Sequence, residues 1–231
     1  MSTKQIGVFP DRENKLEFLT KPIRKMFSIM DRYADAHIED GCFDHAYHYN
    51  ERATLSMFAG AIWRSSKSNL VLEEFGTAKK WSGGEYKGRR DIWFRVAGRI
   101  CYGEAKQSWI RFPRQNVLPE PFFEILRDET DAANDAVAES SGEGCPEIGL
   151  GILFITPFVH THQVSCARRN LQLLHNSINE ALGPWTEREH MHVLWGRYVR
   201  PELLEESGSY EWSNGKSGTC PSLDVLICTR A

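Results

Sequence analysis

The stretch RRDIWFRVAGRICYGEAK, residues 89–106, decides the fold that this sequence predicts. It contains two short runs rich in β-branched and aromatic residues, Arg90–Val96 and Arg99–Lys106, on either side of Ala97-Gly98. Runs of this length and composition around a glycine-containing connection are typical of consecutive strands. We therefore expect a β-hairpin here.

The two faces of this hairpin carry opposite chemistries. A two-residue turn at Ala97-Gly98 sets Asp91 opposite Glu104, and a turn at Gly98-Arg99 sets Asp91 opposite Lys106. Both registers place the two acids and the lysine on one face, within about 5–8 Å of each other. The other face is apolar or small in both registers and should pack on helices; it holds Ile92, Phe94, Val96, Cys101, Gly103 and Ala105.

Two carboxylates beside an ammonium group suit a hard divalent cation, because such cations prefer oxygen ligands. Mg²⁺ or Mn²⁺ held there can polarise a phosphodiester and activate a water molecule. The same spacing also fits an ordinary ladder of acids against a lysine on a solvent-facing side. Spacing alone leaves both interpretations open.

Hydrophobic periodicity predicts the elements around the hairpin. Helices are expected at Lys21–His37, after the N-cap Asn50, at Pro121–Glu139 and at Val164–Leu182. Further strands are expected at Asn69–Phe75, Ile148–Thr156, His192–Tyr198 and Leu223–Thr229, and Glu205–Ser217 should be a loop. Three strands, a crossover helix and a buried strand describe an α/β fold with a mixed central sheet flanked by helices.

Length and composition favour one enlarged domain over residues 1–231, since 41% of the residues are hydrophobic. We expect a soluble, cytoplasmic protein without a membrane contact, because no secretory leader or membrane-spanning run is present. The six cysteines are scattered and should be reduced. The pairs His160/His162 and His190/His192 and the spacing Cys42-x-x-His45-x-x-His48 do not supply four zinc ligands at a known structural spacing. Ordinary polar or core histidines are the better interpretation.

The net charge of −3 hides an uneven distribution of charge. Segment 79–114 holds ten bases against three acids with aromatic residues between them. This pattern fits either a nucleic-acid surface or an ordinary solvated face. The acidic sides of the helix expected at Pro121–Glu139 should face solvent. The glycine-rich connection 76–88 is either a phosphate-contacting loop or a plain loop kept soluble by its lysines. The predicted nucleic-acid contacts are Lys79, Lys80, Lys87, Arg89 and Arg90.

The hairpin motifs resemble those of the PD-(D/E)xK nuclease superfamily, which includes restriction enzymes. The resemblance rests on Arg89-Arg90-Asp91-Ile92-Trp93 and on Tyr102-Gly103-Glu104-Ala105-Lys106, and Arg90 stands where the nominal proline would be. It covers about residues 50–156 and implies a restriction-endonuclease-like core with the order α-β-β-β-α-β. The N-terminal helix at 21–37 and a C-terminal extension at 157–231 lie outside it.

This resemblance implies a divalent-metal-dependent nuclease that acts on DNA, with Asp91 and Glu104 as ligands of Mg²⁺ or Mn²⁺. It implies Lys106 at the attacking water and Glu51, on the helix before the sheet, as an accessory ligand. Gln107 resembles a glutamine that assists at the site in some members. Double-strand cleavage with one site per chain also makes a homodimer a possible assembly.

Two other functions are compatible with the sequence. A catalytically inactive protein of the same fold could bind nucleic acid or a partner protein through the basic surface. A zinc hydrolase or deaminase could use the His-x-His pairs, although no HExxH, HxxEH or CxxC element accompanies them.

Overall fold

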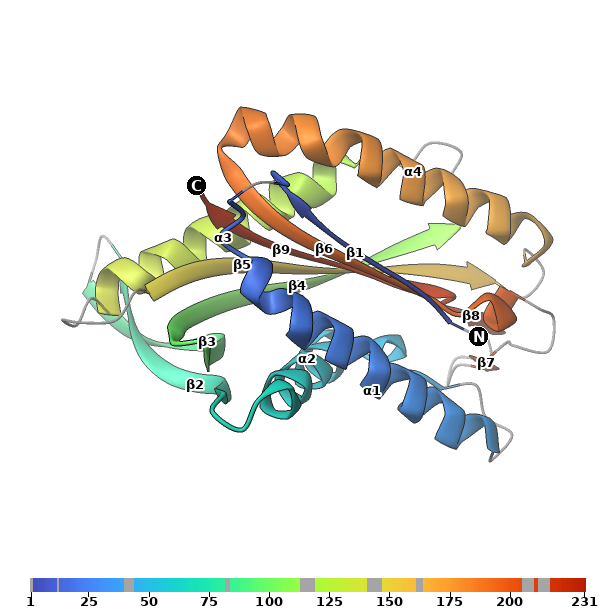
Figure 1. Cartoon of the computed structure of the whole chain (residues 1–231), viewed down its shortest axis with the longest axis horizontal. Coiled ribbons are helices and arrows are strands. Elements are labelled where there is room, and N and C mark those ends of the chain that lie inside the picture. The colour runs from blue at the N-terminus through green and yellow to red at the C-terminus, as the bar shows by residue number, and fades with distance from the viewer. Residues whose placement is uncertain are drawn as a thin grey trace.

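A computed structural model of the chain has one central β-sheet with helices on both faces (Figure 1). It describes residues 2–11, 13–39, 44–81, 84–112, 119–140, 147–160, 164–204, 210–211 and 217–231. The strands are β1 (Thr3–Phe9), β2 (Leu70–Trp81), β3 (Gly84–Val96), β4 (Arg99–Phe112), β5 (Glu147–His160), β6 (Met191–Val199), β7 (Tyr210–Glu211), β8 (Ser217–Thr219) and β9 (Ser222–Arg230). The α-helices are α1 (Thr20–Glu39), α2 (Glu51–Ser65), α3 (Glu120–Ser140) and α4 (Val164–Glu189), and the short 3-10 helices are η1 (Glu17–Leu19), η2 (Ala46–His48) and η4 (Pro201–Leu204).

The main path of the sheet has the strand order β1-β6-β9-β5-β4-β3-β2. β4 and β5 are parallel and α3 connects them, whereas the other described neighbours are antiparallel. Strands from both ends of the chain join the same sheet. The predicted mixed α/β sheet with flanking helices is therefore confirmed.

The central hairpin has the first of the two predicted registers. Ile92 lies opposite Gly103 and Val96 lies opposite Arg99, so the turn residues are Ala97 and Gly98. Both have positive φ, 52° and 78°, which matches the twist of a two-residue hairpin turn.

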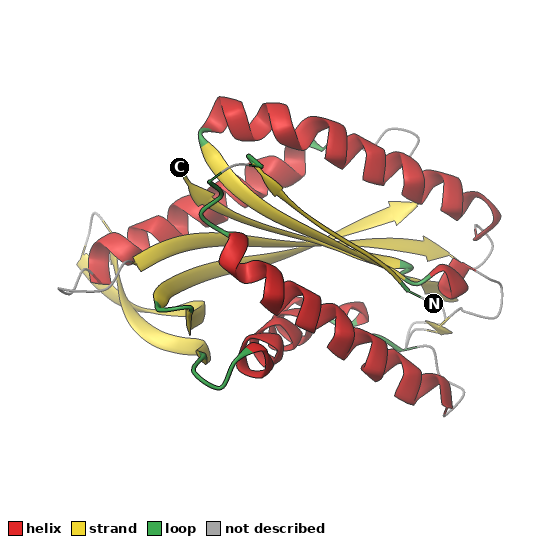
Figure 2. Cartoon of the chain, in the orientation of Figure 1, coloured by secondary structure: helices red, strands yellow, loops and turns green. Residues whose placement is uncertain are grey.

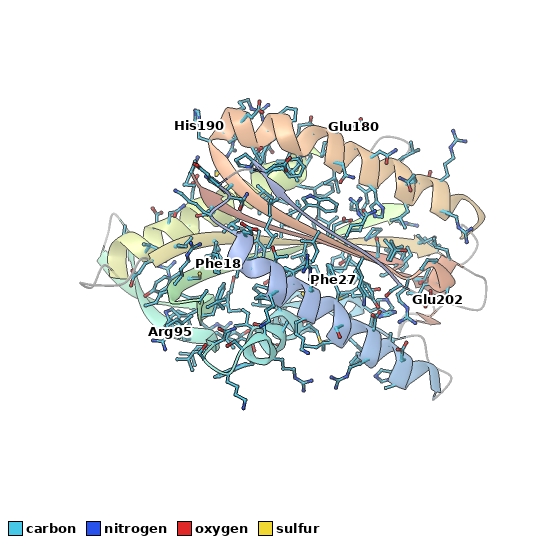
Figure 3. All side chains as sticks on the ribbon, viewed as in Figure 1. Phe18, Phe27, Arg95, Glu180, His190 and Glu202 are labelled. Atoms are coloured by element: carbon cyan, nitrogen blue, oxygen red, sulfur yellow. The ribbon has the colours of Figure 1, made fainter. Side chains whose placement is uncertain are left out.

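Two hydrophobic cores lie on opposite faces of the sheet, and Figure 2 shows the helices layered on both of these faces. α1 and α2 cover one face, and α3 and α4 cover the other. The apolar side of the hairpin, including Ile92, Phe94 and Cys101, is buried in the α1/α2 core as predicted. In Figure 3, Phe27 lies between α1 and the sheet, whereas the exposed Glu180 points away from the sheet on α4.

Close packing of α3 on β5 depends on two glycines. A Cβ at Gly151 would lie 2.6 Å from the carbonyl oxygen of Leu126, and a Cβ at Gly149 would lie 2.5 Å from the Asn134 side chain. Only glycine permits this approach of helix to strand. The approach brings α3 close to the end of the hairpin where the charged residues gather.

Three predictions about the elements were wrong. β1 was not predicted, although it pairs with β6 along its whole length. The glycine-rich connection 76–88 is not a loop, because β2 and β3 extend through most of it and pair as far as Trp81 with Gly84. Pairing along a long hairpin overrides the weak strand propensity of glycine and lysine. β7 lies within the predicted loop Glu205–Ser217, most of which lies outside the described residues.

Within the described residues, no helix is long and apolar enough to cross a membrane.

Candidate active site at the fork between β3 and β4

The candidate site lies where β3 separates from β4, beyond the pair Ile92–Gly103, and we call this place the fork. The β3/β4 ladder ends at the pair Ile92–Gly103, while β4 continues along β5 as far as Phe112. The β2/β3 ladder also skips one pair, at Glu74 and Asp91, where Glu74 has a φ of 49°. Asp91 therefore stands at an interruption in both ladders.

Beyond the point where β3 separates, two carboxylates accept hydrogen bonds from the free edge of β4. Asp91 Oδ2 accepts a hydrogen bond from the Ala105 N–H at 2.8 Å, and Glu51 Oε2 accepts one from the Gln107 N–H at 3.0 Å. Ala105 and Gln107 are two residues apart, so their N–H groups point to the same edge of β4, about 7 Å from each other. The fold thus brings Asp91 and Glu51, 40 positions apart in the sequence, to one strand edge. Asp91 reaches this edge instead of standing on the face that strand alternation predicted.

Glu51 holds its position because α2 begins at the predicted N-cap. Asn50 accepts a hydrogen bond from the Ala53 N–H at 2.9 Å, and Glu51 is the first residue of the helix. Burial and the nearby Asp91 raise the pKa of Glu51, against the lowering effects of the Gln107 N–H and of Lys106. Its carboxylate therefore lies among competing charges and not simply at a solvated helix end.

Glu104 is buried and paired. Arg90 Nη1 lies 3.0 Å from Glu104 Oε1 and also donates to the Ala132 carbonyl of α3 at 3.4 Å. Arg90 is only 6% exposed, so the structure does not place it on a surface where it could contact nucleic acid. Strict alternation would point Arg90 to the α2 side with Ile92, but the strand is interrupted at Asp91 and the side chain reaches α3.

Glu129 on α3 is a member of this cluster that the sequence interpretation missed. Its pKa is raised to about 7, first by burial and then by the carboxylates of Glu104, Asp91 and Glu51, while Lys106 opposes the shift. The prediction that the acidic sides of α3 all face solvent is wrong at this half-buried residue. A signal was present, because Glu129 falls three residues after the buried Leu126 and so shares its side of the helix.

Lys106 is exposed to solvent, whereas the side chain of Gln107 is held by hydrogen bonds. Lys106 is exposed and carries the charge that opposes the pKa shifts of Glu51 and Glu129. The Gln107 amide donates to the Tyr47 carbonyl at 3.0 Å and to Thr156 Oγ1 at 3.1 Å, and it accepts from Thr54 Oγ1 at 3.0 Å. Gln107 is therefore placed to hold α2 and β4 together beneath Glu51.

The predicted nucleic-acid contacts fall into three groups. The side chains of Lys79, Lys80 and Lys87 lie outside the described residues. Arg89 is exposed and donates to Glu74 Oε2 at 3.1 Å, and Glu74 also pairs with Arg52. Arg90 is buried, as described above.

The atoms at the fork that could bind a metal ion are carboxylate oxygens, which are the ligands that a hard divalent cation prefers. Their positions do not close around one point. Within the residues that the structure describes, no group of three or more His, Cys, Asp or Glu side chains is arranged to hold a metal ion. The ion pair with Arg90 engages one oxygen of Glu104.

The histidines, too, form no group arranged to hold a metal ion in the described part of the chain. His45 and His48 are buried side by side, with ring centroids 5.0 Å apart. Burial lowers the pKa of His48 to about 4 and holds the pKa of His45 well below its usual value. Both rings are therefore neutral near pH 7, while Cys42 and His162 lie outside the described residues.

Comparison with known proteins gives no match to a family model, to a curated protein or to a solved structure. The resemblance to PD-(D/E)xK nucleases therefore rests on the two hairpin motifs.

Proposed function

We propose that the chain is a divalent-cation-dependent nuclease that hydrolyses phosphodiester bonds in DNA on a restriction-endonuclease-like core. The observation that carries this proposal is the anchoring of Asp91 and Glu51 on alternate N–H groups of β4. The residue between those two N–H groups is Lys106. A carboxylate pair held at a strand edge beside an exposed lysine provides charge for both a cation and a phosphate.

A cluster of partly and fully buried carboxylates supports a cation-binding role. Four carboxylates, those of Glu51, Asp91, Glu104 and Glu129, influence one another at the fork. Among the described residues, the cations that act on these carboxylates include Lys106, Arg90 and Arg52. Burial is the largest cause of the raised pKa of Glu51 and of Glu129, and neighbouring carboxylates add to it in both. Perturbed carboxylates of this kind are typical of functional sites.

Each residue has a distinct role in this proposal. Asp91 and Glu51 each use one oxygen on β4, and their second oxygens are the candidate ligands of Mg²⁺ or Mn²⁺, with Glu104 and Glu129 beside them. A bound cation would polarise the phosphodiester and lower the pKa of a water molecule. Lys106 orients the attacking water or offsets charge on the phosphoryl oxygens. Gln107 positions Glu51.

The substrate assignment rests on charge. The bases of segment 79–114 follow the hairpin that carries the fork, and exposed Arg89 lies two residues from Asp91. Contacts to a phosphate backbone need positive charge more than a fixed shape. Cleavage of both strands of DNA would favour a homodimer with two such sites.

The test is cleavage of plasmid and linear DNA in Mg²⁺ or Mn²⁺ by the wild type, by Lys106→Ala and by Asp91→Asn. We expect cleavage by the wild type and a loss of about 100-fold or more in each variant. Lys67→Ala, which removes an exposed lysine in the turn after α2, should cleave like the wild type. Cleavage that survives both fork substitutions would contradict the proposal.

The buried Arg90–Glu104 pair favours a second candidate, a catalytically inactive protein that binds nucleic acid or a partner protein. A guanidinium already occupies one oxygen of an expected metal ligand. Calorimetric titration with Mn²⁺, for the wild type and Glu104→Ala, separates the two candidates. An absence of Mn²⁺ binding to the wild type, even with DNA present, would support the inactive protein.

A further inference from the structure

A second polar site lies at the opposite end of the sheet. A cavity of about 430 Å³ opens between α4, the strands β1 and β6, and η4. This volume is within the range of small-molecule pockets. β9 and β5 separate β6 from β4 in the strand order, so this cavity is distinct from the fork. In Figure 1, α4 crosses above β6 and β1 on the side away from α1.

A row of polar residues crosses three strands beneath the cavity. Gln5 of β1 lies opposite Arg197 of β6, which in turn lies opposite Asp224 of β9. Arg197 Nε donates to Asp224 Oδ1 at 2.6 Å, and His175 Nε2 of α4 lies 3.4 Å from Asp224 Oδ2. Arg197 is 4% exposed, His175 5% and Asp224 1%, so the floor of the cavity is a built and buried polar cluster.

Arg197 retains donors for a ligand. Its Nη2 makes only long contacts of 3.5 Å, to the His175 carbonyl and to Asn179 Oδ1. Its Nη1 has no hydrogen-bond partner among the described residues, although a guanidinium carries five N–H donors. Both Arg197 and His175 line the cavity, whereas Asp224 lies behind them and holds them in place.

The polar side chains that line the cavity are basic or neutral. Arg168, Arg197 and His175 line it, together with amide side chains, and no Asp or Glu is among its described lining residues. Acidic Glu180 of the same helix points outward instead (Figure 3). In a chain with a net charge of −3, a concave site whose described polar lining is basic or neutral favours an anion.

α4 supplies most of these donors from one side. Arg168, Gln172, His175 and Asn179 are spaced by four, three and four residues, so they form one stripe beside the buried leucines of the helix. Thr3 and Gln5 of β1 line another part of the cavity, and an apolar wall consists of Leu171, Val199, Pro201 and Leu204. The cavity can therefore hold a charged group and a less polar body together.

We propose that this cavity binds a phosphorylated small molecule, with its phosphate against Arg197, His175 and Arg168 and its uncharged part against the apolar wall. Phosphate is favoured over carboxylate because its additional oxygens can use donors from α4 and β6 at once. Arginine is the cation best suited to this recognition.

Calorimetric titration of the full chain with adenosine 5′-monophosphate, adenosine and inorganic phosphate tests the proposal. We expect the monophosphate to bind at least about tenfold more tightly than adenosine, and phosphate to compete with it. Arg168→Ala should weaken monophosphate binding about tenfold, and His175→Gln should also weaken it. Arg169→Ala is the matched control, because Arg169 is an exposed neighbour on α4 that does not line the cavity.

The double variant Arg197→Met with Asp224→Leu removes the buried pair without leaving an unpaired charge, and it should bind no monophosphate. Equal binding of adenosine and its monophosphate would overturn the proposal, as would equal losses in Arg168→Ala and Arg169→Ala. Binding of duplex DNA that depends on Arg168, with no monophosphate binding, would also overturn it and would assign the cavity to a nucleic-acid backbone.

Discussion

The two ends of the sheet each contain a buried arginine–carboxylate pair on neighbouring strands, but the surroundings of the two pairs are opposite in charge. Arg90 and Glu104 join β3 and β4 at 3.0 Å, among the carboxylates of Asp91, Glu51 and Glu129. Arg197 and Asp224 join β6 and β9 at 2.6 Å, beside His175 and under a cavity lined by bases. The neighbours of each pair, and not the pair itself, decide which ligand charge the region can accept.

The pKa shifts of the carboxylates express the same difference. At the fork, burial and the surrounding acids raise the pKa of Glu129 to about 7. Under the cavity, burial also acts to raise the pKa of Asp224, but His175 and Arg197 outweigh it and the net shift is downward. At the fork, the neighbouring carboxylates add to the effect of burial, whereas under the cavity the neighbouring cationic groups outweigh it.

The largest expected effect is the loss of Asp224. Asp224→Ala should lower the free energy of unfolding by about 3–5 kcal/mol, because it leaves Arg197 buried without a counter-charge. Glu104→Ala should cost less, about 1–3 kcal/mol, because Arg90 keeps other carboxylates nearby and the crowding of acids decreases. Urea unfolding of both variants at pH 7 measures the difference.

The control is the double variant Arg197→Met with Asp224→Leu, which should recover most of the stability lost in Asp224→Ala. Equal losses in Asp224→Ala and Glu104→Ala would show that the neighbours do not govern the energy of these pairs.

Patterns within short segments predicted much of the fold. The apolar face of the hairpin, the cap at Asn50 and the buried strand β5 follow from alternation, capping chemistry and buried apolar runs. The turn was narrowed to two registers, of which the structure has the one at Ala97-Gly98. β1 escaped prediction because its residues alternate weakly and its strand character comes from pairing with β6.

The candidate site was only partly predictable, because it depends on an interruption that leaves no local signal. Strand alternation put Asp91 and Glu104 on one face, but the break at Glu74 and Asp91 sends the Asp91 carboxylate to the edge of β4. The same break turns Arg90 inward to Glu104. Predicting Glu129 as a member of the site would require knowing how closely α3 approaches β5. The packing of α3 on Gly149 and Gly151 sets that distance.

A pH titration of cation binding should sharpen the contrast between the two regions. Below pH 7 Glu129 is mostly protonated, so the affinity for Mn²⁺ should rise about tenfold between pH 6 and pH 8. Glu129→Gln should bind Mn²⁺ more weakly and lose this rise, while Asp128→Asn, at an exposed neighbouring acid, should keep it. Calorimetric titration at three pH values measures these affinities.

The stability of the cation-free chain should change in the opposite direction over this range. Between the ordinary value of 4.5 and about 7, folded Glu129 holds a proton that the unfolded chain has released. Its contribution to the free energy of unfolding therefore falls as pH rises through this window. An equal pH dependence of Mn²⁺ binding in Glu129→Gln and in the wild type would remove Glu129 from the site.

The smallest expected effect on stability is that of Arg89→Ala. The same variant also tests whether DNA binds at the fork or at the cavity. The Arg89 side chain is 57% exposed and pairs with Glu74 at 3.1 Å, so its loss should change the free energy of unfolding by less than about 0.5 kcal/mol. If Arg89 contacts a DNA phosphate beside the fork, the variant should weaken DNA binding and reduce the slope of log affinity against log salt by about one. Arg168→Ala, at the cavity, should leave that slope unchanged. DNA binding that depends on Arg168 and not on Arg89 would reverse the comparison. The nucleic acid would then lie at the cavity beside β1 and β6, and the acidic fork would have no substrate beside it.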